Sequence, residues 1–262
     1  MLNKKICQTF YAILSKDIAV YNAKWLSRSI DGIVWMSSVI IVAHYIMPLF
    51  GVTNAQFGTF TLIGNFAIWG LFETLTNVAL FFGDLQGDKS ISYYLSLPLP
   101  SYMIFIEQAF ASAYRSMASS ILILPLGKLI LGDAFDLSMV NWPYFIIAFI
   151  VINVFYGFFN IFITSYVPDL SSLTMIRSRI IFPLWCLGGF QFTWKMSYQV
   201  LPTLAYINLC NPIMYIMDGI RSTVFAPEAY LPFWNCMGML VLFSILFGYF
   251  GIQKLKQRLD CI

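Results

Sequence analysis

Residues 143–167 read PYFIIAFIVINVFYGFFNIFITSYV, a run of twenty-five positions that contains no Asp, Glu, Lys or Arg. A helix needs about 20 mostly apolar residues to cross the roughly 30 Å of hydrocarbon in a bilayer. Trp142, which enters the run, is a residue type enriched at membrane interfaces. The run therefore predicts a membrane-spanning helix.

The composition of the whole chain agrees with this prediction. Of its 262 residues, 60% are hydrophobic and 10% are charged, and the mean hydropathy is +0.77. Soluble domains are about 45–50% apolar and about 25% charged. A net charge of +3 is too small to neutralise a phosphate backbone, so a nucleic-acid partner is not expected.

Five further segments are interpreted as spans because they are long, apolar and poor in charge. They cover residues 33–50, 57–82, 103–131, 180–193 and 233–252. Residues 195–231 contain Lys195, Pro202 and Asp218 and are too polar and broken for a lipid-facing helix, so we expect re-entrant helices that enter from the far side. The prediction is a single all-α membrane domain, residues 1–262, with six transmembrane helices.

The basic residues predict the orientation of this domain. Eleven of the fifteen Lys and Arg residues lie in the N-terminal arm, the loops after the second and fourth spans, and the C-terminal tail. Cytoplasmic loops of membrane proteins carry an excess of Lys and Arg. We therefore expect both termini in the cytoplasm and a location in the bacterial inner membrane.

The N-terminal arm, residues 1–29, has the pattern of an amphipathic helix that lies along the cytoplasmic interface. Its apolar residues recur at three- and four-residue steps: Ile6, Phe10, Ile13, Leu14, Ile18, Tyr21 and Trp25. Asp17, Lys24 and Arg28 interrupt this stripe. The arm is expected to act either as a membrane anchor or as a platform for a cytoplasmic partner.

Polar residues in the second span recur every four residues and share one helix face: Asn65, Trp69, Glu73 and Asn77. A polar face inside a membrane lines a water-filled path or joins helices by hydrogen bonds, and both interpretations stay open. Glu73 and Arg115 fall at comparable depth, which suggests an ion pair between them.

Several kinds of enzyme chemistry have no motif in the sequence. There is no G-x-x-x-x-G-K-[ST] loop for a nucleotide, and the single histidine, His44, excludes an H-E-x-x-H metal site. The five cysteines are far apart and form no C-x-x-C pair, so we expect neither a zinc site nor a disulfide framework. We predict a chain that is not an enzyme and binds no cofactor itself.

The region before the last span contains the most specific pattern. It consists of an Asn-Pro pair followed by Tyr and Gly-x-Arg, and of a Gly-Gly-aromatic run upstream: Asn211, Pro212, Tyr215, Gly219 and Arg221, with Gly188, Gly189 and Phe190. On a six-span map, this order resembles the membrane subunit of ABC-2 type exporters. The resemblance covers nearly the whole chain.

In that family the loop after the second span contacts the ATPase subunit. The corresponding region here, residues 84–100, is an expected coupling helix that matches the family pattern only in part. Its candidate contact residues are Asp84, Gln86, Gly87, Asp88, Lys89, Tyr93, Tyr94, Leu95, Leu97 and Pro98. A short helix with apolar and aromatic side chains facing the cytoplasm needs a groove on a partner, although a capped surface loop is the alternative.

The resemblance implies a permease that works as a homodimer, with ATP and magnesium bound by separate cytoplasmic ATPase subunits. The implied substrate is amphipathic, such as a drug, a glycolipid or a lipid-linked polysaccharide. The implied path follows the dimer interface, past the polar face of the second span and past Trp185 and Phe190. The alternative is an ion-coupled secondary transporter, which would usually show internal repeats.

Overall fold

The computed structural model describes residues 2–51, 56–86, 90–97 and 99–259, and every regular element in these ranges is helical. Five helical segments in them are long and apolar enough to cross a bilayer: Trp25–Phe50, Phe57–Asp84, Ser101–Ala134, Trp142–Tyr166 and Phe233–Arg258. They correspond to five of the six predicted spans. The protein is an all-helical, multi-pass membrane protein, as its composition predicts.

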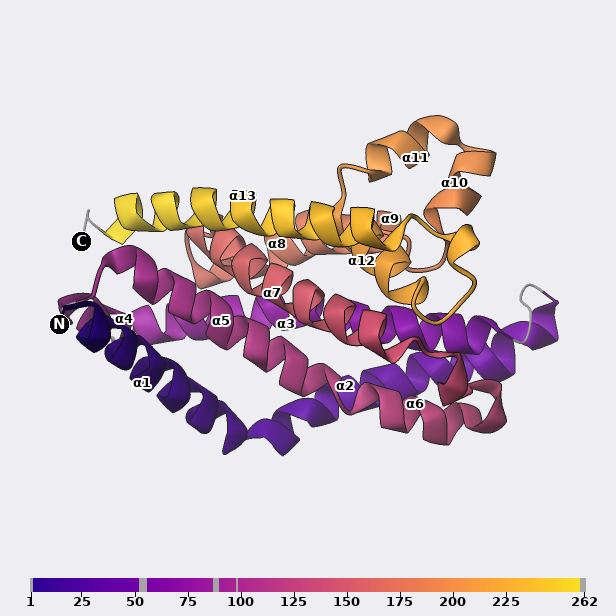
Figure 1. Cartoon of the computed structure of the whole chain (residues 1–262), viewed down its shortest axis with the longest axis horizontal. Helices are drawn as coiled ribbons and strands as arrows, with labels where there is room; N and C mark the ends of the chain where they lie inside the picture. Colours follow the sequence, from indigo (N-terminus) through magenta and orange to yellow (C-terminus); the bar gives the residue numbers. More distant parts are fainter. Residues whose placement is uncertain (1, 52–55, 87–89, 98, 260–262) are drawn as a thin grey trace.

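The long helices run roughly along one axis of the molecule (Figure 1). They are α2 (Trp25–Ile41), α3 (Phe57–Gln86), α5 (Ser101–Ser120), α7 (Trp142–Tyr166) and α13 (Phe233–Leu259). Helix α1 (Leu2–Asn22) begins, and α13 ends, at the same end of this bundle (Figure 1). The short helix α4 (Ser90–Ser96) joins α3 to α5 at that end.

Prolines explain where the spans deviate from a regular α-helix. Pro125 has no N–H to donate to Ile121, and helix α5 ends just before that residue and continues as α6 (Ile123–Leu131). Two π-helical turns, η1 (Val42–Ile46) and η6 (Arg177–Ile181), each lie directly before a segment with proline in its first turn. The 3-10 turn η2 (Met47–Phe50) completes the first span.

The expected fifth span, residues 180–193, is not among the five membrane-length helices of the described chain. A continuous helical run does pass through it, made of η5 (Leu170–Ser172), α8 (Leu173–Ile176), η6 and α9 (Phe182–Leu187). This run ends at Leu187 rather than near Thr193. Gly189 has a φ of +82°, which an L side chain rarely adopts, and the chain turns there.

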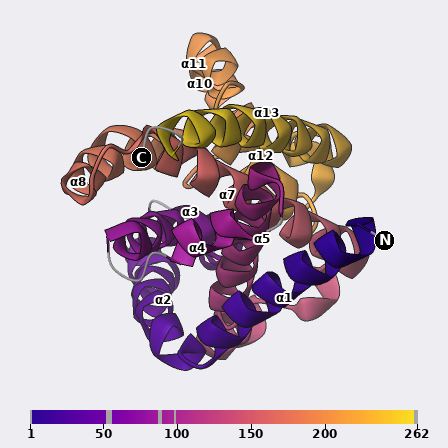
Figure 2. The ribbon, with the colours of Figure 1, turned by 90° about the vertical axis from the view of Figure 1, so that its left-hand side faces the viewer.

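The polar region before the last span divides into two parts. Helices α10 (Trp194–Val200) and α11 (Pro202–Asn208) form a hairpin that projects from the bundle (Figures 1 and 2). The Trp194 indole N–H fastens the hairpin by donating to the Ala205 carbonyl at 2.8 Å. Helix α12 (Pro212–Arg221) is buried over its full length and packs on α3 and α13.

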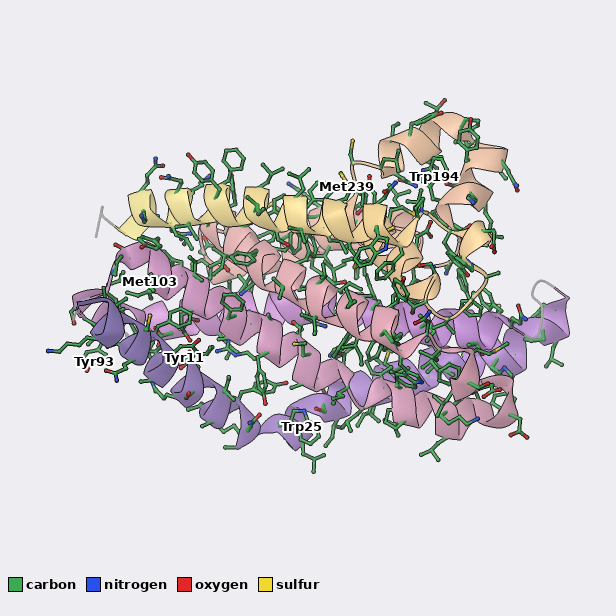
Figure 3. The ribbon with its side chains drawn as sticks, viewed as in Figure 1. Tyr11, Trp25, Tyr93, Met103, Trp194 and Met239 are labelled. Carbon is green, nitrogen blue, oxygen red and sulfur yellow. The ribbon has the colours of Figure 1, made fainter. Side chains whose placement is uncertain are left out.

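Helix α1 turns its apolar stripe toward α5. Every stripe residue named above is buried or half-buried, whereas Lys5, Gln8 and Lys16 on the other face are exposed. A turn at residues 23–24 separates α1 from α2. Trp25 opens α2 and anchors it, because its indole N–H donates to the Ala118 carbonyl of α5 at 2.7 Å (Figure 3).

Candidate functional site

A polar cavity of 540 Å³ lies between α1, α3, α4, α5 and α7. Helices from distant parts of the sequence contribute to it, and its lining is unusually polar for a chain of this composition. The polar lining residues are Lys16, Asp17, Tyr21, Asn77, Asp84, Tyr94, Gln108, Ser112, Arg115 and Asn160. Polar and ionisable groups within membrane spans mark sites of function in membrane proteins, so this cavity is the candidate site.

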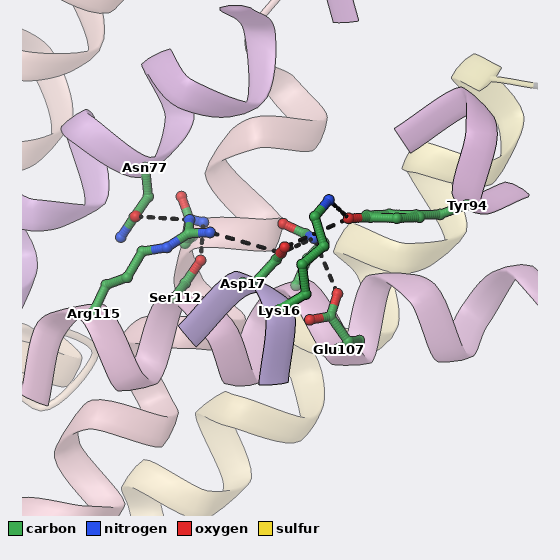
Figure 4. A network of polar contacts seen from close by, with 9 residues as sticks. Lys16, Asp17, Asn77, Tyr94, Glu107, Ser112 and Arg115 are labelled. Carbon is green, nitrogen blue, oxygen red and sulfur yellow. Dashed lines mark hydrogen bonds and ion pairs between the residues drawn. The ribbon is translucent and has the colours of Figure 1, made fainter. Parts of the chain in front are cut away.

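Arg115 joins three helices at this cavity (Figure 4). Its Nη1 donates to Asn77 Oδ1 on α3 at 3.3 Å, and its Nη2 lies 3.9 Å from Asp17 Oδ2 on α1. The side chains of Arg115 and Asp17 are 15% and 14% exposed. Because both charges are largely removed from water, each needs the other as a partner.

An amide links Asp17 to a second acid. Gln108 Nε2 donates to Asp17 Oδ2 at 3.2 Å and to Glu107 Oε2 at 3.0 Å. Glu107 is fully buried, and its Oε1 has no hydrogen-bond partner in the described part of the chain. The network therefore holds two carboxyl groups close to one guanidinium group.

Lys16 and Tyr94 connect α1 to α4. Lys16 Nζ donates to the Tyr94 hydroxyl at 2.5 Å. This hydrogen bond raises the pKa of Lys16, and burial raises the pKa of Tyr94. At neutral pH the ammonium is therefore charged and the phenol is neutral, so the pair acts as a charge-assisted hydrogen bond.

On the α7 side, Asn160 Nδ2 donates to Ser112 Oγ of α5 at 2.9 Å. The two helices approach closely at Gly157, where an added Cβ would lie 3.1 Å from the Ala113 Cβ and still closer to the Ala109 carbonyl. Small residues allow this approach in membrane helices, and interhelical hydrogen bonds stabilise it. The polar residues of α7 thus join helices at this level.

The residues predicted to line the substrate path do not all lie in one place in the structure. Asn77 lines the polar cavity, whereas Asn65 is fully buried and both of its side-chain polar atoms lack partners among the described residues. Trp185 and Phe190 do come together, with ring centroids 5.2 Å apart. Phe72 lies between them and Trp69, at 5.8 Å from Trp185 and 6.5 Å from Trp69.

Glu73 is buried on the same face of α3, one turn before Asn77. We expected it to pair with Arg115. Arg115 also contacts Asn77, one turn further along α3, and Asp17 on α1, and its pairing with Glu73 stays a prediction.

The residues that resemble the family motif form a structural clamp. Arg221 is fully buried, and its guanidinium group donates to the carbonyls of Gly189 at 2.5 Å and Phe190 at 2.6 Å. The same group lies 3.5 Å from the Phe60 ring centroid. An added Cβ on Gly188 would lie 2.6 Å from Ile213 Cβ. The clamp therefore fixes the turn after α9 against α12 and α3.

Other motif residues shape α12 itself. Asn211 caps the helix by accepting from the Ile213 N–H at 3.0 Å, and Pro212 follows as its first residue. The Tyr215 hydroxyl donates to the Leu209 carbonyl at 2.8 Å. Gly219 packs so closely on α13 that an added Cβ would lie 2.9 Å from Met237 Cε.

The predicted coupling residues divide into an inner and an outer group. Tyr94 is buried, and Leu95 and Leu97 are half-buried against Ile13 and Ile104. Asp84 lines the cavity, and Gln86 ends α3. The outer residue is Tyr93, which is 63% exposed at the end of the bundle (Figure 3). Other members of the predicted set lie outside the described residues: Gly87, Asp88, Lys89 and Pro98.

The sequence interpretation missed Lys16, Asp17 and Gln108 as site residues. A signal for Asp17 was present, because this acid interrupts the apolar stripe of α1 and has to face the bundle. No comparable signal marks Gln108, since a single amide in a span is also compatible with a surface position.

Comparison with known proteins assigns no family to the chain. No protein-family model matches it, and no curated protein is similar enough to count as a relative. Among the described residues, no three His, Cys, Asp or Glu side chains come together to hold a metal ion.

Proposed function

We propose that the protein is the membrane-spanning subunit of an ATP-driven exporter that resembles ABC-2 type permeases. In this proposal two copies form the substrate path and bind separate ATPase subunits, which carry ATP and magnesium. The substrate is an amphipathic molecule such as a drug, a glycolipid or a lipid-linked polysaccharide. The observation that carries the proposal is the placement of α4, which exposes the aromatic Tyr93 and whose inner side contacts α1 and α5.

In this proposal, contacts of α4 transmit its movement to the membrane-spanning helices. Its buried Tyr94 contacts Lys16 on α1, and the neighbouring Asp17 contacts Arg115 on α5. Arg115 in turn contacts Asn77 on α3. A partner that pushed on Tyr93 would therefore move a packed network that reaches two spans and the N-terminal helix.

The course of the chain supports the proposed sixth crossing. Helices α7 and α13 run in the same direction: Tyr144 lies near Phe233 with ring centroids 4.9 Å apart, and Phe158 packs where Gly248 lacks a side chain. Residues 167–232 must therefore return the chain along the bundle. The helical run at 170–187 is about 27 Å long at about 1.5 Å per residue, close to the thickness of the hydrocarbon.

The proposed orientation follows from charge. The N-terminal arm, the loops after the second and fourth predicted spans, and the C-terminal tail hold eleven of the fifteen Lys and Arg residues, so these parts face the cytoplasm in the proposal. Helices α10, α11 and α12 then form the re-entrant segment on the external side.

The test is whether an ATPase subunit binds through Tyr93. Tagged protein is purified from its native cells after mild cross-linking, and co-purified ATP hydrolysis is measured. We expect Tyr93→Asp to reduce it at least tenfold, about 1.4 kcal/mol or more in binding free energy. Tyr11→Asp is the matched control, because Tyr11 is 66% exposed on α1. The proposal is wrong if wild-type protein carries no ATPase activity, or if Tyr93→Asp retains it.

An ion-coupled transporter is the second candidate, and the buried Glu107 favours it. A carboxyl group with an unpaired oxygen inside a membrane span is typical of proton and ion pathways. Vesicles that contain only this chain distinguish the two functions. Collapse of an imposed pH gradient, abolished by Glu107→Gln, would support the ion-coupled transporter, and a stable gradient would support the exporter.

A further inference from the structure

An apolar groove of 400 Å³ lies on the bundle, away from the polar cavity. Three membrane-length segments form it: α13 contributes Val241, Ile245 and Ile252, while α7 and α5 contribute their own aliphatic side chains. None of its lining residues belongs to α2, α8 or α9. The groove is therefore separate from the face on which the proposed substrate path lies.

The length of the groove matches one leaflet of a bilayer. Its lining on α13 extends from Val241 to Ile252, eleven helical steps that rise about 16 Å. Half of a hydrocarbon core of about 30 Å is about 15 Å. Gly248 lies midway along the groove, where the Phe158 ring packs so closely on α13 that an added Cβ would lie 2.8 Å from its Cδ1.

A basic residue stands at one mouth of the groove. Lys256 lies one helical turn beyond Ile252 on the same face of α13, and Tyr102 lies one turn before the groove residue Ile106 on α5. The Lys256 ammonium is 5.4 Å from the Tyr102 ring centroid. In the described part of the chain it has no carboxylate within ion-pair distance.

The other two basic side chains at the end of α13, Lys254 and Arg258, point away from the groove. Lys254 Nζ lies 3.5 Å from the Tyr166 ring centroid, toward α7. Arg258 donates to the Pro168 carbonyl at 2.6 Å and to the Val167 carbonyl, and so holds the end of α7. Lys256 is thus the base positioned to meet a ligand in the groove.

We propose that this groove binds one acyl chain of an anionic membrane phospholipid, with the Lys256 ammonium attracted by the net negative charge of its headgroup. The groove supplies an apolar channel of one-leaflet length, and Lys256 supplies a positive charge at the level of the headgroups. Basic side chains near an anionic membrane surface contribute about 1 kcal/mol each to binding, or about fivefold in affinity. The inference does not depend on what the protein transports.

The test uses purified, delipidated full-length protein titrated with dioleoyl phosphatidylglycerol or dioleoyl phosphatidylcholine and analysed by native mass spectrometry. We expect the wild-type protein to bind phosphatidylglycerol about fivefold more tightly than phosphatidylcholine. Ile245→Trp fills the groove from an exposed position and should abolish both adducts. Lys256→Gln should abolish only the preference for the anionic lipid.

Matched variants separate these effects from a general loss of structure. Leu246→Trp places the same bulk on a side of α13 away from the groove, and Lys254→Gln removes a neighbouring charge. Both controls should bind lipid as the wild-type protein does. Equal binding of the two lipids by the wild-type protein, or lipid adducts that persist in Ile245→Trp, would overturn the proposal. A change of oligomeric state in Ile245→Trp without loss of lipid would instead identify a second copy as the occupant and also overturn it.

Discussion

At the scale of single residues, the contact between Asp17 and Arg115 explains an apparent irregularity of α1. A charged residue on the apolar face of a helix is unfavourable unless a partner compensates it. Asp17 faces the bundle because Arg115, inside α5, needs an acid there, and Gln108 completes the site. Asp17 therefore interrupts the apolar stripe because its carboxylate is needed to pair with the largely buried guanidinium group.

We predict that Asp17→Asn and Arg115→Gln each lower the free energy of unfolding by about 1–3 kcal/mol, because each leaves a largely buried charge without its partner. The double variant should lose less than the sum of the two single losses. Thermal unfolding in detergent measures all three. Asp133→Asn, at an exposed position, is the control and should change little. Additive losses would contradict the coupling.

At the scale of elements, Asn211 connects α9 and α12, two helices that are not adjacent in the sequence. Its Oδ1 caps α12, while its Nδ2 donates to the Leu184 carbonyl of α9 at 2.9 Å. Thr193 makes only a local cap, accepting from the Met196 N–H of α10 at 3.2 Å. Loss of the Asn211 side chain should therefore destabilise two helices, whereas loss of the Thr193 side chain should destabilise one.

We predict that Asn211→Ala increases hydrogen exchange in both α9 and α12, with a loss of about 1–3 kcal/mol from the cap and the second hydrogen bond. Thr193→Ala is the matched control and should increase exchange in α10 alone. Hydrogen exchange resolved by mass spectrometry compares the two. If Asn211→Ala affected only α12, the proposed link between the helices would be absent.

At the scale of the whole molecule, the distribution of charge predicts how the bundle sits in the bilayer. Most basic residues lie in the N-terminal arm, the loops after the second and fourth predicted spans, and the C-terminal tail. Helix α1 begins and α13 ends at the same end of the bundle (Figure 1). Asp133 lies just beyond the end of α6, in the last residues of the third membrane-length segment. Cys7 is exposed near the start of α1. Helix α1 begins and α6 ends at opposite ends of the bundle (Figure 1), so we expect these two positions on opposite sides of the membrane.

We predict that a membrane-impermeant maleimide labels Asp133→Cys in intact cells and labels Cys7 only after permeabilisation. Each position is tested as the single cysteine of an otherwise cysteine-free chain. Permeabilised cells, in which both positions should react, provide the control for accessibility. Labelling of Cys7 in intact cells would show that the orientation is reversed.

Much of the architecture could be predicted from charge alone, since hydrocarbon excludes charged side chains and five of the six predicted spans are membrane-length helices. The exact ends of the helices were harder to predict from the sequence. The end of α9 at Leu187 depends on how Gly188 and Gly189 pack against α12. The residues next to them in the sequence do not indicate this packing. The network around the candidate site was also hidden, because Asp17 and Gln108 are 91 positions apart.

The sequence by itself determined the membrane class, the long helices and the amphipathic face of α1, because each depends on the periodicity or polarity of neighbouring residues. The tertiary structure decided which polar residues meet. It joined Asp17 to Arg115 and gave Arg221 a structural role in holding the turn after α9. The physical reason is that a buried polar group needs a partner, and only the packing of distant helices determines which partner it finds.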